Sequence, residues 1–172
     1  MSYLSAMLDP KQSPKCVDDM AKMLTNEKVK FDMIVGQGNS GVLGGVLLSV
    51  KMKKPMVIVR KKTEKTHGSL IERPDNFGSH TRGKYFQDCR YIIVDDGIDT
   101  GKTITRINDT IRKVCKDNTW TPPECVGVIL YDQRSISGET DIDGVHDDEG
   151  WDFPVYDVHN HVKYEGCDWS WH

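Results

Sequence analysis

Short apolar runs alternate along the chain with segments of helical periodicity, and this alternation limits the fold more than any other feature. Apolar residues recur at helical spacing from Ser13 to Lys28, where Ser13 and Pro14 are typical of a helix start. Strands that alternate with helices predict a parallel sheet with right-handed crossovers. We therefore expect an α/β fold with a central parallel sheet flanked by helices. The expected strands are Phe31 to Val35, Met56 to Val59, Tyr91 to Val94, Cys125 to Leu130 and Val155 to Val158.

The length of 172 residues fits a single domain over residues 1–172. We expect its core over about residues 15–131 and a small C-terminal tail, or hood, over residues 132–172. No run of about 18 apolar residues occurs, and Met1 to Pro10 lacks the parts of a secretory signal. Scattered cysteines without a C-x-x-C pair indicate reduced thiols. We expect a cytoplasmic protein with no membrane contact and no nucleic-acid partner.

Residues 60–88 are polar and lack sustained periodicity, which predicts a long flexible loop with some hairpin character. Lys and Arg outnumber Asp and Glu over residues 51–90, and the reverse holds over residues 132–157. A basic segment favours an anionic ligand nearby. Two ordinary solvated surfaces would explain the charge pattern equally well if charge were the only clue.

The segment from Tyr91 to Thr103 is the most informative about chemistry. Its strand delivers two adjacent carboxylates, Asp95 and Asp96, and the chain then turns through two glycines into a helix. Backbone N–H groups of such a turn, the positive end of the helix dipole and the hydroxyls of Thr100 and Thr103 can hold a phosphate monoester. Carboxylates just before it suit ribose hydroxyls or Mg²⁺-bound water. The pattern therefore predicts a site for a sugar phosphate.

A nucleotide P-loop is a competing interpretation, because the turn ends in Gly-Lys-Thr. However, three residues stand between Gly97 and Gly101 where the P-loop has four, and Asp96 occupies the place of its first glycine. The spacing disfavours the P-loop.

The run from Val94 to Thr103, Val-Asp-Asp-Gly-Ile-Asp-Thr-Gly-Lys-Thr, resembles the phosphoribosyl pyrophosphate (PRPP) motif of type I phosphoribosyltransferases, with its closest likeness to the hypoxanthine-guanine enzymes. The resemblance implies an enzyme that joins a nucleobase to PRPP with release of pyrophosphate. It implies that Asp95 and Asp96 hold the ribose hydroxyls and contact Mg²⁺ through water. The residues implied for the 5′-phosphate are Asp99, Thr100, Gly101, Lys102 and Thr103.

By the same resemblance, Asp99 matches a residue of the purine enzymes that manages a proton on the incoming base, which makes it a catalytic candidate. Aspartate is also a common turn residue, so a structural role is the alternative. Gly97 departs from the bulky apolar residue that is usual there. The substitution can loosen the turn but removes no ligand.

A second glycine turn, Val35-Gly-Gln-Gly-Asn-Ser-Gly41, follows an expected strand and resembles the family's pyrophosphate loop. Many relatives place Arg or Lys at the position of Ser40. Taken alone, an ordinary turn between strand and helix explains the glycines well. The residues that the resemblance implies for pyrophosphate are Gln37, Gly38, Asn39, Ser40, Gly41, Arg60 and Lys61.

The segment from Arg60 to Gly68 is similar to the Lys-x-His-Gly loop of orotate phosphoribosyltransferases. Lys65 and His67 are therefore candidates for leaving-group stabilisation or proton transfer during catalysis. The alternative is a solvated basic loop. Because this segment points to orotate and the PRPP motif points to a purine, the base stays open, with a slight preference for orotate.

Aromatic residues are frequent in the tail, where stacking on a ring would hold a planar base. They are Trp151, Phe153, Tyr156, Trp169 and Trp171. The same rings can complete a core or a dimer contact, and the resemblance implies a homodimer. A non-catalytic regulator of the same fold that senses PRPP is the alternative function.

Overall fold

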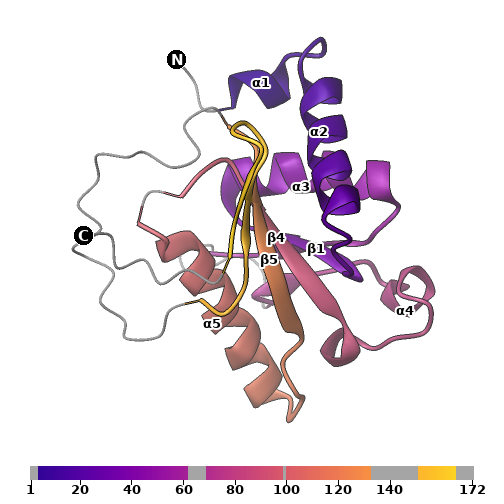
Figure 1. Ribbon diagram of the computed structural model, residues 1–172. Coiled ribbons are helices and arrows are strands. Elements are labelled where there is room, and N and C mark those ends of the chain that lie inside the picture. The colour runs from indigo at the N-terminus through magenta and orange to yellow at the C-terminus, as the bar shows by residue number, and fades with distance from the viewer. Residues whose placement is uncertain (1–3, 62–68, 99, 133–150, 166–172) are drawn as a thin grey trace.

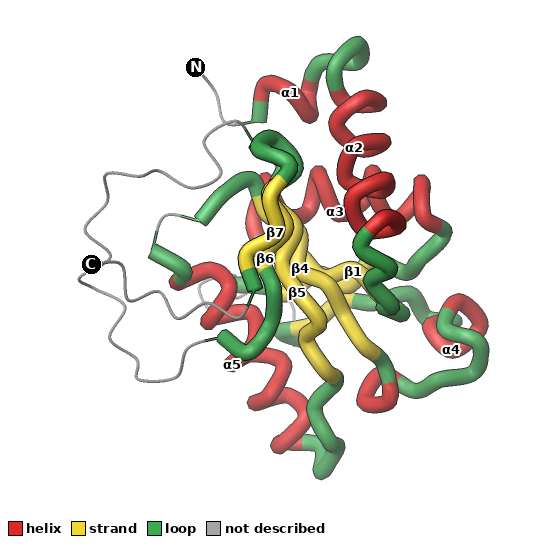
Figure 2. The backbone as a smooth tube through the Cα atoms, in the orientation of Figure 1, coloured by secondary structure: helices red, strands yellow, loops and turns green. Residues whose placement is uncertain are grey.

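A computed structural model describes residues 4–61, 69–98, 100–132 and 151–165, and within them the chain forms one seven-stranded sheet (Figures 1 and 2). The strand order is β3-β2-β1-β4-β5-β6-β7. Strands β2, β1, β4, β5 and β6 are parallel neighbours, whereas β3 and β7 pair antiparallel at the two edges. This confirms the expected α/β fold with a mostly parallel sheet. The strands are β1 Met33–Gly36, β2 Met56–Val59, β3 Ile71–Glu72, β4 Arg90–Asp95, β5 Glu124–Leu130, β6 Val155–Asp157 and β7 Val162–Tyr164.

Helices cover both faces of this sheet, with α2 and α3 on one side and α5 on the other (Figure 1). The helix expected from Ser13 is α2, but its N-cap is Gln12 rather than Ser13, and it ends two residues earlier than expected. The short helix α1 was not expected from the sequence. The helices are α1 Ser5–Leu8, α2 Ser13–Asn26, α3 Gly38–Met52, α4 Phe77–His80 and α5 Lys102–Asp117, and a 3₁₀ turn spans Phe86–Asp88.

The central strands are buried on both faces, because alternate residues point into two different apolar cores. Ile92 of β4 packs with Met20 and Leu24 of α2. The neighbouring Ile93 packs instead with Ile104 and Ile107 of α5. All six side chains are at most 1% exposed, so the sheet is a rigid platform for the loops at its ends.

Residues 69–88 confirm the hairpin character expected of the long loop, and they contain more regular structure than the sequence predicted. Strand β3 pairs with β2, and helix α4 follows it. Phe77 and Phe86 are buried with their ring centroids 6.0 Å apart. These two rings anchor the segment to the apolar core. Because they stand among polar residues, they form no periodic pattern in the sequence. Residues 62–68 lie outside the described part of the chain.

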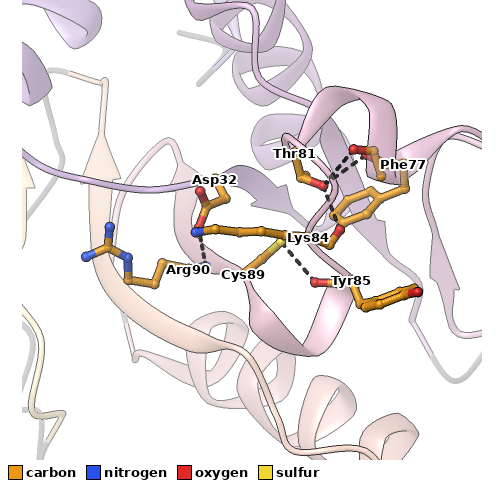
Figure 3. Close-up of polar contacts among 8 residues, drawn as sticks. Asp32, Phe77, Thr81, Lys84, Tyr85, Cys89 and Arg90 are labelled. Atoms are coloured by element: carbon orange, nitrogen blue, oxygen red, sulfur yellow. Dashed lines mark hydrogen bonds and ion pairs between the residues drawn. The ribbon is translucent and has the colours of Figure 1, made fainter.

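Asp32 ties this segment to the amino end of the sheet (Figure 3). Its Oδ2 accepts hydrogen bonds from Lys84 Nζ at 2.9 Å and from the backbone N–H of Arg90 at 3.0 Å. Burial opposes ionisation, but the two donors outweigh it and lower the pKa of Asp32 below its ordinary value. Asp32 is thus a satisfied structural carboxylate.

The tail contributes two strands to the same sheet. Strand β6 pairs parallel to β5, and Val155 and Tyr156 are buried against the two cores. Within the described residues, no helix combines the length and apolar character needed to span a bilayer.

Candidate active site

The carboxyl ends of β1 and β4 lie side by side, which brings the two glycine-containing turns together. Strand β1 pairs parallel to β4, with Val35 opposite Ile93. Gly36 ends β1 and Asp95 ends β4, and each strand leads into a helix that covers an opposite face of the sheet (Figure 1). Open parallel sheets bind ligands at this edge, where the crossovers diverge to opposite faces.

Asp95 is the most deeply buried carboxylate of the predicted site. It is 5% exposed, and its Oδ1 accepts hydrogen bonds from Ser40 Oγ at 2.9 Å and from the backbone N–H of Asp96 at 3.0 Å. Burial raises the pKa of Asp95 to about 7, the neighbouring Asp96 carboxyl adds to this shift, and the Ser40 hydroxyl opposes it. Such a carboxylate gains from a ligand that offers hydroxyl donors or positive charge.

Asp96 leaves the strand half-buried, and its carbonyl oxygen accepts a hydrogen bond from the backbone N–H of Asp132 at 3.0 Å. The chain then bends toward Gly101, whose φ of 68° lies in the left-handed region that favours glycine. Helix α5 begins at Lys102, so its first N–H groups and the positive end of its dipole lie directly after the two carboxylates. The two carboxylates and the helix start thus follow one another along the chain, and their roles toward ribose and phosphate stay predictions.

Trp151 packs over the same turn. A Cβ added to Gly101 would lie 2.8 Å from the indole, so a side chain there would displace the ring as well as strain the positive φ. The indole also stacks on Phe153, with centroids 5.8 Å apart and planes within 8°. Both rings are half-buried against the core on the α5 side. The tail thus brings the Trp151 ring to the turn at Gly101, with Phe153 stacked on it.

The second glycine segment is not a separate loop. Gly38 is the first residue of α3, so residues 38–41 form the first helical turn. The glycine turn expected over residues 36–41 is therefore shorter, because the helix already begins at Gly38. The helix start packs closely on β4, because a Cβ on Gly41 would lie 2.7 Å from the carbonyl oxygen of Val94. The predicted pyrophosphate loop is therefore a second helix N-terminus at the same edge.

Gln37 occupies the N-cap position of this helix without a side-chain capping hydrogen bond, and it is buried, at 2% exposed. Its Nε2 donates to the carbonyl oxygen of Arg60 at 3.5 Å, and its Oε1 is buried without a hydrogen-bond partner among the described residues. The side chain joins the ends of β1 and β2. Gln37 therefore contacts the protein framework rather than projecting into solvent.

The two cations predicted at the end of β2 have different surroundings. Lys61 is exposed, and its Nζ lies 3.8 Å from the position that a Cβ on Gly38 would occupy. Arg60 instead forms an ion pair with Glu72 of β3. Lys61 thus brings positive charge to the start of α3, whereas Arg60 braces the β2–β3 hairpin.

The phosphoribosyl transferase domain family matches residues 5–153 of the chain, which is most of its length. The chain belongs to the phosphoribosyltransferase family.

Relatives within the family act on different bases according to their names. The chain is 30% identical over 113 residues to the hypoxanthine/guanine phosphoribosyltransferase of Aciduliprofundum boonei, covering 62% of this chain and 58% of that protein. It is 32% identical over 112 residues to the adenine phosphoribosyltransferase of Ureaplasma parvum, covering 62% and 63%. The chain thus spans about three-fifths of the length of these relatives.

The fold is shared with a solved phosphoribosyltransferase. The crystal structure of the orotate phosphoribosyltransferase of Francisella tularensis superposes with a TM-score of 0.61 at 16% identity, covering 88% of this chain and 68% of that one. At this identity the likeness supports the type I phosphoribosyltransferase fold alone.

The site residues fit a Mg²⁺ ion that arrives with a diphosphate. Among the described residues, no group of three or more His, Cys, Asp or Glu side chains forms a protein cage for a metal. Mg²⁺ is commonly held by one or two carboxylates, water and substrate phosphates. Asp95 and Asp96 offer such carboxylates at the edge where the two helix N-termini meet.

Some predicted site residues are not tested by this geometry. Lys65, His67 and Asp99 lie outside the described residues, and their catalytic roles stay predictions. Asn39, Thr100 and Lys102 are exposed, and Thr103 is half-buried in the first turn of α5.

Sequence reasoning missed one residue of the site. Tyr131 follows β5, and its hydroxyl donates to the carbonyl oxygen of Ser40 at 3.0 Å. Its position directly after an apolar strand was the available signal, because such residues lie at the carboxyl edge of a parallel sheet.

Proposed function

We propose that the chain is a phosphoribosyltransferase enzyme that transfers the phosphoribosyl group of PRPP to a nucleobase. The observation that carries this proposal is the buried carboxylate of Asp95, followed by Asp96 and the N-terminus of α5, next to a second helix N-terminus at Gly38. Two anion sites flanking a diol site match a donor with a phosphate at one end and a pyrophosphate at the other. Membership of the family supports the same reaction class.

In the proposed reaction a ring nitrogen of the base attacks C1′ of the ribose. The C1′–O bond breaks, pyrophosphate leaves with the bonding electron pair, and the nitrogen loses its proton. Asp95 and Asp96 hold the ribose hydroxyls, and the start of α5 holds the 5′-phosphate. The start of α3 and the Lys61 ammonium face the leaving pyrophosphate. Most of the acceleration then comes from positioning and from fixed charges.

We propose Mg²⁺ as the cofactor. When bound with the donor it neutralises charge on the pyrophosphate. Asp95 and Asp96 would contact it, directly or through water. Removing the metal with a chelator should reduce pyrophosphate release to background, and Mg²⁺ should restore it. Equal rates with and without chelator would contradict this part of the proposal.

The proposal also concerns which nucleobase the enzyme uses and where that base lies. Trp151 lies beside the turn at Gly101 and stacks on Phe153, so we propose that these two rings border the base. Tyr156 is buried in the core, and Trp169 and Trp171 lie outside the described residues. The Lys65-Thr66-His67-Gly68 segment favours orotate, whereas two relatives of about 30% identity are named for purines.

The deciding experiment incubates the protein with PRPP, Mg²⁺ and, separately, orotate, adenine, hypoxanthine and guanine, and measures pyrophosphate. We expect release with one base class, and the doubly substituted variant Asp95→Asn/Asp96→Asn should abolish it. A protein that binds PRPP by calorimetry but releases no pyrophosphate with any base would support the sensing alternative. Absence of PRPP binding would refute both functions.

A further inference from the structure

The first turn of α3 makes a direct side-chain contact with the predicted ribose carboxylate. Ser40 Oγ donates to Asp95 Oδ1 at 2.9 Å, although the two residues lie 55 positions apart in the sequence. Resemblance alone had assigned Ser40 to pyrophosphate. Its hydroxyl is instead directed at the other half of the donor site.

Ser40 is itself held from several directions. Tyr131 Oη donates to its carbonyl oxygen at 3.0 Å. The neighbouring Gly41 packs against β4, and a Cβ on Gly44 would lie 2.6 Å from the Tyr131 ring. The start of α3 therefore has little freedom relative to the ends of β4 and β5.

The contact also orients the carboxylate. The Ser40 hydroxyl and the Asp96 backbone N–H both donate to Oδ1 of Asp95, and two donors on one oxygen fix the rotation of the group. A cation at position 40 would form an ion pair with Asp95 and compete with its ligand. A neutral hydroxyl holds the carboxylate without cancelling its charge.

We propose that Ser40 is a positioning residue that links the pyrophosphate end of the donor site to its ribose end by orienting Asp95. This inference rests on the proposed function. The first turn of α3, which would receive the pyrophosphate, thus also holds the carboxylate that would receive the ribose. Ser40 acts through Asp95, so its removal should weaken donor binding without affecting the base.

The first test compares Ser40→Ala with the unsubstituted protein in steady-state kinetics. We expect the KM for PRPP to rise about tenfold, the order expected for loss of a hydrogen bond to a charged group. The KM for the base should stay unchanged, and kcat should change much less than the KM for PRPP. Ser40→Thr, which keeps the hydroxyl, should restore donor binding.

Ser49→Ala is the matched control. Ser49 lies near the other end of α3, where its hydroxyl donates to the carbonyl oxygen of Lys54. It also loses a serine hydroxyl from the same helix, but its KM for PRPP should equal that of the unsubstituted protein. An unchanged KM for PRPP in Ser40→Ala, or an equal rise in the KM for the base, would overturn the proposal.

A second test needs no catalysis and so separates this inference from the proposed function. Melting temperatures of Ser40→Ala, Asp95→Ala and the double variant form a cycle in the ligand-free protein. We expect non-additive shifts, because either single change removes the same hydrogen bond. Additive shifts would refute the contact itself. If the unsubstituted protein releases no pyrophosphate while the cycle is non-additive, the proposed function fails but the Ser40–Asp95 contact stands.

Discussion

Asp32 and Asp95 lie at opposite ends of the sheet and differ in what surrounds their carboxylates. Asp32 receives an ammonium and a backbone N–H, and its pKa is lowered. Asp95 is more buried, has Asp96 as a neighbour, and its pKa is raised to about 7. Charge at the amino end is neutralised within the protein, which stabilises the fold. The buried Asp95 carboxylate lies beside a second carboxylate, which costs stability, and we propose that a ligand neutralises this charge.

The largest expected effect concerns ligand binding at the carboxyl end. Asp95→Asn/Asp96→Asn should weaken PRPP binding by at least about 100-fold, because charge-assisted hydrogen bonds to the ribose are lost. Asp32→Asn should leave PRPP affinity unchanged. Isothermal titration calorimetry checks both. Equal losses in the two variants would show that the two ends do not differ in function.

The next effect concerns stability at the amino end. Asp32→Ala should lower the free energy of unfolding by about 1 to 3 kcal/mol, because the Arg90 N–H and the Lys84 ammonium lose their acceptor. Asp75→Ala, an exposed carboxylate in the same part of the chain, is the control and should change little. Urea denaturation measures the difference. A loss of unfolding free energy no larger than that of the control would contradict the structural role of Asp32.

The two aspartates should also respond to pH with opposite sign. A folded-state pKa of about 7, against 3.8 for an ordinary aspartate, means that the folded protein binds the Asp95 proton more tightly. Stability is therefore lost as the pH rises from about 4 to about 7. Asp95→Asn should raise the melting temperature by several degrees at pH 8, and by less at pH 5.

Asp32→Asn should show the reverse, because the pKa of Asp32 is lowered. Its native stabilisation is present above the unfolded pKa and is lost as the pH falls through the folded pKa. The variant should therefore be less stable than the unsubstituted protein at pH 8 and approach it in acid. Melting curves across this range that show the same sign for both variants would break the comparison.

The smallest effect is expected at Lys61. Lys61→Met should raise the KM for PRPP only a few-fold, and the difference should shrink at high salt, because an exposed cation is screened. Steady-state kinetics at two ionic strengths provide the measurement. Arg60→Met should instead lower stability, since Arg60 pairs with Glu72 across the hairpin. A stability loss in Lys61→Met together with a higher KM for PRPP in Arg60→Met would contradict the roles assigned to these two residues.

Much of the fold was predictable because its signals are local. Four-residue and longer apolar runs identified β1, β2, β4 and β5, and the spacing of Ile104, Ile107 and Ile111 identified α5. The edge strand β3 was not predicted, because two residues are too few to show a period. Helix α4 was not predicted, because its one buried apolar residue, Phe77, stands among polar residues.

The sequence by itself determined the alternation of strands and helices, the double carboxylate at the end of β4 and the two helix starts that follow strands, since each depends on residues a few positions apart. Only the tertiary structure decided that Ser40 contacts Asp95 and that Trp151 covers Gly101. These contacts join distant segments, and they depend on strand order and register, which no local pattern contains.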